Sequence, residues 1–113
     1  MKIAQKNIVF TGSALSDLRA FPLSARREAG FQLDRVQTGR EPDDWKPMST
    51  IGPGVQEIRI RDAQGAFRVI YIARFAHAVY VLHCFQKKTQ KTSKHDLDLA
   101  TRRLKELTKE LNQ

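Results

Sequence analysis

Three neighbouring stretches of the chain carry basic residues at positions where a β-strand would direct them onto one exposed face. Residues 58–61 alternate isoleucine with arginine, so the two isoleucines point to a core while Arg59 and Arg61 point to the opposite side. Two later apolar stretches repeat the arrangement. The cations predicted to share this face are Arg59, Arg61, Arg68, Lys87 and Lys88. Cations that converge on a rigid sheet suit a phosphodiester backbone, so the pattern predicts a phosphate-binding surface.

Arginine and lysine can also support cleavage of RNA without a metal, in which the 2′-hydroxyl is the nucleophile. Arginine stays charged and can stabilise the extra negative charge at phosphorus. A lysine among other cations has a lowered pKa and can accept or donate a proton. We therefore expect Arg68, Lys87, Lys88 and Lys91 to be catalytic, and Arg59, Arg61, Lys46 and Lys94 to bind RNA.

Three further residues could serve in proton transfer, although each has a structural interpretation as well. Glu57 is a candidate base, but its position beside Arg59 favours a salt bridge that orients the arginine. His83 alternates with Val81 and Phe85 and should share their face, which favours a buried, hydrogen-bonded histidine. His95 at the start of the last predicted helix could shuttle a proton or be an exposed bystander.

The composition limits the compartment and the class of partner. The chain has 113 residues, a formal charge of +8 and a pI near 10.1, which favours a polyanionic partner such as nucleic acid or an acidic protein. Its single cysteine, Cys84, can form neither an internal disulfide nor a cysteine-based metal site, so no metal and no cofactor is expected. The apolar run at 8–10 is too short for a signal sequence or a membrane span. We expect a cytoplasmic protein with no membrane partner.

The order of predicted elements is β-α-α-β-β-β-β-α. Strands are expected at 8–11, 48–51, 55–61, 66–75 and 78–86, and helices after Ser13, near Leu23 and after Ser93. Residues 40–47 contain two prolines and two adjacent aspartates and are expected to form a loop. Short connections between the last strands favour an antiparallel meander. The prediction is a single α+β domain over residues 1–113, with a small, curved antiparallel sheet, two N-terminal helices and a C-terminal helix.

This order, together with the residues along it, resembles the RelE/ParE superfamily of toxin–antitoxin toxins, and most of all its HigB-like, phage-derived branch. The stretches that carry the resemblance are 45–47, 57–59, 67–71, 81–85, 87–89 and 91–92. The resemblance implies a small curved sheet flanked by helices. It also implies a cognate antitoxin, expected to be of the helix-turn-helix type, that forms a hetero-oligomer with the toxin.

Four basic positions match the superfamily residue by residue. Arg68 matches the arginine of an aromatic-arginine-aliphatic strand, which by resemblance contacts the scissile phosphate. Arg59 and Arg61 match two basic strand positions, and Lys88 matches a basic position after the last strand. RelE itself has a tyrosine in its C-terminal segment, where this chain reads Lys94-His95. A tyrosine-dependent mechanism is therefore not implied.

Three functions remain compatible with the sequence. Many members of the superfamily are metal-independent endoribonucleases that cut mRNA in the ribosomal A site, whereas the ParE branch inhibits DNA gyrase without catalysis. A basic module that only binds RNA or the ribosome is the third alternative. The lysines at 87–91, together with Arg68, favour the endoribonuclease, which would bind mRNA and the ribosome.

Overall fold

The computed structural model describes residues 5–112 and has the predicted order of elements. The elements are β1 (Asn7–Phe10), α1 (Ala14–Arg19), α2 (Leu23–Gln37), β2 (Trp45–Pro47), β3 (Val55–Asp62), β4 (Gly65–Ile72), β5 (Ala78–Lys87) and α3 (Lys94–Leu111). The predicted start of the last helix after Ser93 is confirmed, since the side chain of Ser93 accepts a hydrogen bond from the Asp96 amide at 3.2 Å. Gly39 follows α2 with a φ of 85°, a conformation that glycine adopts without strain.

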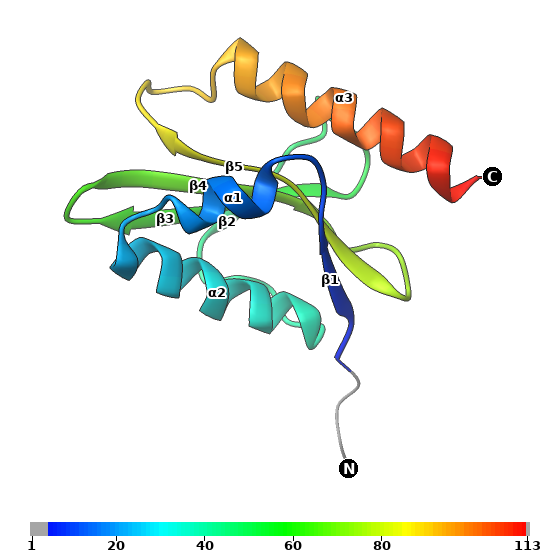
Figure 1. Cartoon of the computed structure of the whole chain (residues 1–113), viewed down its shortest axis with the longest axis horizontal. Coiled ribbons are helices and arrows are strands. Elements are labelled where there is room, and N and C mark those ends of the chain that lie inside the picture. Colours follow the sequence, from blue (N-terminus) through cyan, green and yellow to red (C-terminus); the bar gives the residue numbers. More distant parts are fainter. Residues whose placement is uncertain (1–4, 113) are drawn as a thin grey trace.

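The five strands form one sheet in the order β1-β5-β4-β3-β2 (Figure 1). The meander from β2 to β5 is antiparallel, as predicted. β1 departs from the antiparallel pattern because it runs parallel to β5, so the sheet is mixed. Parallel neighbours need a long crossover connection, and here α1, α2 and three strands lie between the two partners. The short turns seen in the sequence connect the later strands, so they did not indicate that β1 pairs with β5.

The expected strand at 48–51 is wrong. The strand lies three residues earlier, at Trp45–Pro47, and ends on a proline that an edge strand tolerates. Residues 48–51 form a turn instead, closed by a hydrogen bond of 3.0 Å from the Ile51 amide to the Met48 carbonyl. Met48 and Ile51 are apolar because they pack into the core under α3, and not because they alternate along a strand.

Helices cover both faces of the sheet (Figure 1). On one face, α1 and α2 bury a core that includes Leu18, Leu33, Ile58 and Val81. On the other face, α3 packs over a second core that includes Leu82 and Leu107, whereas the hairpin of β3 and β4 extends beyond the beginning of α3 in Figure 1. Within the described residues, no helix therefore covers the part of this second face next to the hairpin.

Candidate functional site

The pairing register brings the predicted cations together on the face that α3 covers only in part. Arg59 of β3 lies opposite Arg68 of β4, and Arg61 and Lys87 each lie opposite Ala66. Lys46 of β2 lies opposite Glu57, which shares a face with Arg59 and Arg61 because alternate residues of a strand do. The set that we call the cation cluster is Lys46, Arg59, Arg61, Arg68 and Lys87. Four different strands contribute to it.

A buried ion pair lies at the centre of the cation cluster. Glu57 has no exposed surface and Arg68 is 4% exposed, and Arg68 Nε lies 3.5 Å from Glu57 Oε1. Lys46 Nζ is 4.0 Å from the same oxygen, and the Thr92 hydroxyl donates a hydrogen bond of 2.9 Å to Glu57 Oε2. The sequence predicted a salt bridge for Glu57 but suggested the wrong arginine. The partner is Arg68, across the sheet, and not Arg59.

Arg68 is held in place and is less accessible than the sequence predicted. Its Nη1 donates a hydrogen bond of 3.0 Å to the Phe67 carbonyl. Burial lowers the pKa of Arg68, while the charge of Glu57 opposes that effect and the neighbouring Arg59 adds to it. An arginine remains protonated under these conditions, so a charged guanidinium lies just below the surface, with its charge balanced by the carboxylate of Glu57. The segment between β5 and α3 lies over the pair, since it supplies Thr92.

Burial and the neighbouring cations of the cluster also lower the pKa of Lys87. Partial burial lowers its pKa, the charge of Arg68 lowers it further, and Glu57 acts in the opposite direction. Lys46 and Arg59 add smaller effects that also lower the pKa. Losing a proton to form the neutral amine therefore costs Lys87 less free energy than it costs an isolated lysine.

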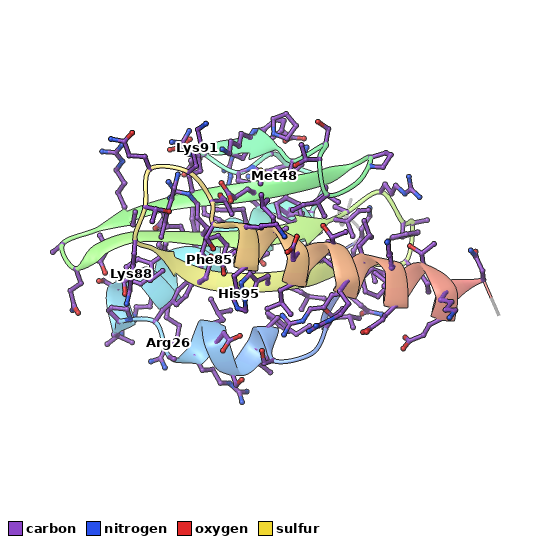
Figure 2. All side chains as sticks on the ribbon, turned by 90° about the horizontal axis from the view of Figure 1, so that it is seen from above. Arg26, Met48, Phe85, Lys88, Lys91 and His95 are labelled. Atoms are coloured by element: carbon purple, nitrogen blue, oxygen red, sulfur yellow. The ribbon has the colours of Figure 1, made fainter. Side chains whose placement is uncertain are left out.

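The other predicted lysines lie at the margin of the cluster or away from it. Lys88 and Lys91 are exposed, and Figure 2 shows Lys88 at the end of β5 and Lys91 farther along the next segment, on the side where Met48 lies. The exposed Lys94 donates a hydrogen bond of 2.8 Å to Asp98 on its own helix, which raises the pKa of Lys94. The structure thus directs Lys94 to Asp98 and not to the cations of the sheet.

His83 connects β5 to the first turn of α3. It is buried, its Nε2 lies 2.6 Å from Asp96 Oδ1, and its ring stacks on Phe85 at 4.9 Å. The interpretation of His83 as a buried, hydrogen-bonded residue fits these contacts. His83 shares a face with Phe85, as expected, but not with Val81. The register shifts so that Ile70 opposes His83 while Tyr71 opposes Val81, which leaves Leu82 as an extra residue. Because of this bulge, Val81 lies in the opposite core.

The burial of His83 predicts a pH dependence of stability. Burial lowers the pKa of His83 below its usual 6.5, and the bond to Asp96 opposes this only in part. The unfolded chain then binds a proton at a pH where the folded chain does not, so His83 costs stability as the pH falls below about 6.5. We expect His83→Gln to reduce the loss of urea stability between pH 7 and pH 5. A loss as steep as that of the wild type would contradict this assignment.

Two residues that tie separate segments of the fold together through polar contacts were not identified from the sequence. Arg103 is buried on α3 and donates hydrogen bonds to the Leu82 carbonyl at 2.8 Å and to Ser13 Oγ at 2.9 Å. A signal existed, because Arg103 lies on the stripe of Ala100 and Leu107 at helical spacing. Thr92 had none, since its partner Glu57 is 35 residues away.

In residues 5–112 no group of three or more histidine, cysteine, aspartate or glutamate side chains is arranged to hold a metal ion. None of the helices in that range combines the length and the apolar character that crossing a bilayer requires.

Comparison with known proteins places the chain by family and by fold. The model of a family described as phage derived protein Gp49-like (DUF891) matches residues 16–105. A mutant of the E. coli toxin RelE in the free state superposes with a TM-score of 0.64 at 15% identity, covering 91% of this chain and 98% of that one. The toxin–antitoxin complex RelBE2 from Mycobacterium tuberculosis gives 0.51 at 22% identity, covering 78% and 98%. Among curated proteins, none matches significantly by sequence. The RelE-like fold predicted from the sequence is confirmed.

Proposed function

The chain belongs to the phage-derived Gp49-like family, and on that basis we propose that it is the toxin of a type II toxin–antitoxin system. We place it in the HigB-like branch of the RelE/ParE superfamily. Its activity would be metal-independent cleavage of mRNA on the ribosome, which inhibits translation in the cytoplasm. The observation that carries the proposal is the cation cluster, built around a buried Glu57–Arg68 pair on a RelE-like sheet.

The cation cluster offers two kinds of electrostatic support to an RNA strand. Arg68 is oriented by the charge of Glu57 at 3.5 Å and by its hydrogen bond to the Phe67 carbonyl, so its guanidinium already has a set direction when negative charge develops at phosphorus. Arg59, Arg61 and Lys46 are more exposed and would bind the flanking phosphates. In this assignment Glu57 positions Arg68 and is not the base, because its oxygens already face Arg68, Lys46 and Thr92.

Lys87 would be the general base that accepts the proton of the nucleophile. Its neutral amine takes the proton of the 2′-hydroxyl as the 2′-oxygen forms a bond to phosphorus. The bond between phosphorus and the 5′-oxygen then breaks, and the leaving oxygen takes a proton. Lys88 or Lys91 would supply that proton from the segment that follows Lys87. The products are a 2′,3′-cyclic phosphate and a 5′-hydroxyl end.

The burial of Arg68 explains why the ribosome should be needed for cleavage. The segment that carries Thr92 lies over Arg68, so this segment must shift before a phosphate can reach the guanidinium. The cation cluster contains no histidine, and His83 is already paired with Asp96 of α3. Alignment of the mRNA on the ribosome would supply part of the rate enhancement that these residues lack.

The antitoxin would be the second partner. A chain of charge +8 with a functional cationic face is most simply neutralised by a segment of complementary charge, which steers association and occupies the site. The similarity of fold to the toxin–antitoxin complex RelBE2 supports an antitoxin partner. We expect that partner to contain a helix-turn-helix domain and to form a hetero-oligomer with this chain.

Inducible expression followed by mapping of transcript 5′ ends tests the proposal. We expect growth arrest together with new 5′ ends inside translated reading frames. Lys105→Ala, which changes an exposed lysine of α3 outside the cation cluster, should leave both effects unchanged. Growth arrest with intact transcripts and relaxed plasmid DNA would instead support gyrase inhibition. Intact transcripts without arrest would leave only the RNA-binding module.

A further inference from the structure

We propose that a pocket at the free edge of β5 binds one nucleobase of the RNA, beside the phosphate at the cation cluster. We call it the edge pocket. The proposal rests on the proposed function and deepens it, because it assigns a place to a part of the substrate that the cations do not contact.

The edge pocket exists because β1 is short. β1 pairs with residues 78–81 of β5, and in the described part of the chain no strand continues along residues 82–87 on that side. The first turns of α1 and α3 flank this open edge and leave a hollow of about 530 Å³. Its walls include Asp17, Phe21, His83, Phe85, Gln86 and His95.

The walls combine planar rings with polar groups, which is what a nucleobase needs. Phe85 and His83 are stacked at 4.9 Å with 18° between their planes, and Phe21 and Phe67 lie 4.8 Å apart. Each of these rings is at most 9% exposed, so a base would stack on the small part of them that lines the hollow, whatever the identity of the base. The carboxylate of Asp17 and the imidazole of His95 add groups that can bond to the polar edge of a base.

His83 supplies an independent reason to expect a ligand. Its Nε2 is bonded to Asp96, while Nδ1 is buried and has no hydrogen-bond partner among the described residues. A buried polar atom without a partner costs free energy unless a ligand or a water reaches it. The ring of this residue is part of the wall of the edge pocket, and because Nδ1 has almost no accessible surface, the ring must turn before an occupant with polar atoms can bond to Nδ1.

The edge pocket adjoins the cation cluster across a single strand. Phe85 is the cross-strand neighbour of Arg68, and neighbouring strands are about 4.8 Å apart. Figure 2 shows Phe85, Lys88 and His95 together at this end of the molecule, with Arg26 on the same side, whereas Lys91 and Met48 lie across the sheet. A ribose can therefore join a phosphate at Lys87 to a base in the edge pocket.

Binding of mononucleotides to the purified protein tests the proposal without requiring cleavage. The dissociation constants of the four nucleoside 5′-monophosphates are compared with that of ribose 5-phosphate, by NMR of the histidine and phenylalanine side chains. We expect at least one nucleotide to bind about fivefold more tightly than ribose 5-phosphate, the gain expected of one stacked base. That nucleotide should shift the signals of His83, Phe85 and His95.

Three variants separate the base from the phosphate. His95→Ala and Phe85→Leu should each bring the ratio of the two dissociation constants towards one. Lys87→Ala should weaken both ligands equally and leave the ratio unchanged. His77→Ala is the matched control, since His77 lies beyond the other end of β5 and bonds to Tyr80 at 2.6 Å, and it should change neither constant.

A ratio of one in the wild type, or a ratio that survives both pocket variants, would overturn the edge pocket as a base site. RNA cleavage with such a ratio would leave the proposed function standing while the edge pocket falls. If the ratio depends on the base but the protein cuts no RNA, the edge pocket stands as a base site and the proposed function falls.

Discussion

Replacing Lys87 by arginine is expected to preserve RNA binding and to slow RNA cleavage by about 100- to 10,000-fold, the usual contribution of general acid–base catalysis. Arginine keeps the positive charge but cannot give up its proton at the pH of the reaction. Lys87 can, because burial and the charge of Arg68 lower its pKa. The measurement is single-turnover cleavage of ribosome-bound mRNA, with binding measured separately on the same substrate.

Lys105→Arg provides the matched control for this substitution. It makes the same chemical change at an exposed position of α3 and should leave the cleavage rate unchanged. Lys87→Arg with a wild-type cleavage rate would remove Lys87 from proton transfer and leave it only the role of an electrostatic contact.

The second large effect is expected on stability. Arg68→Ala should lower the free energy of unfolding by about 3–5 kcal/mol, the range found when one partner of a buried ion pair is removed. Glu57 would stay fully buried, with only Lys46 at 4.0 Å and the Thr92 hydroxyl beside it. Urea unfolding at pH 7 measures the change.

Two further variants test whether the unpaired carboxylate is the cause. Glu57→Gln combined with Arg68→Met removes both charges and should recover most of the lost stability. Arg59→Ala, at the cross-strand position opposite Arg68, should change stability by less than about 0.5 kcal/mol. If Arg68→Ala is as stable as the wild type, the pair is not buried in solution.

This stability effect changes how Arg68 should be examined in cells. A loss of toxicity in Arg68→Ala could come from unfolding as well as from a lost phosphate contact. Arg68→Lys keeps a cation near Glu57 and is the better variant for activity. With the fold intact, we expect it to slow cleavage because a lysine cannot reproduce the two donors of a guanidinium.

Alternation along the strands was sufficient to predict the face of the cations. A strand has a period of two residues, so the alternation of arginine with isoleucine at 58–61 determined which side Arg59 and Arg61 would occupy. The start of α3 after Ser93 is an equally local feature, and it was predicted correctly. The face of the cation cluster and the elements around it were thus accessible from the sequence, except for β2, which carries Lys46 and was expected at 48–51.

Features that depend on pairing between distant parts of the chain were not accessible. Glu57 pairs with Arg68 because both side chains are buried in the sheet, and no local sequence pattern indicates that Arg68 is buried. The extra residue at Leu82 changes which face Val81 takes, and the parallel pairing of β1 depends on the whole crossover. The edge pocket follows from the same pairing, because it lies where β1 stops.

The most direct test of the central claim is a comparison of ribosome-bound mRNA with the same RNA free in solution, both incubated with the purified protein. We expect efficient cutting of the ribosome-bound message and poor cutting of the free RNA, with 5′-hydroxyl ends at the cut sites. Equal cutting of both substrates would contradict the dependence on the ribosome. If neither substrate were cut by a folded protein, the cation cluster would not be the active site of an endoribonuclease.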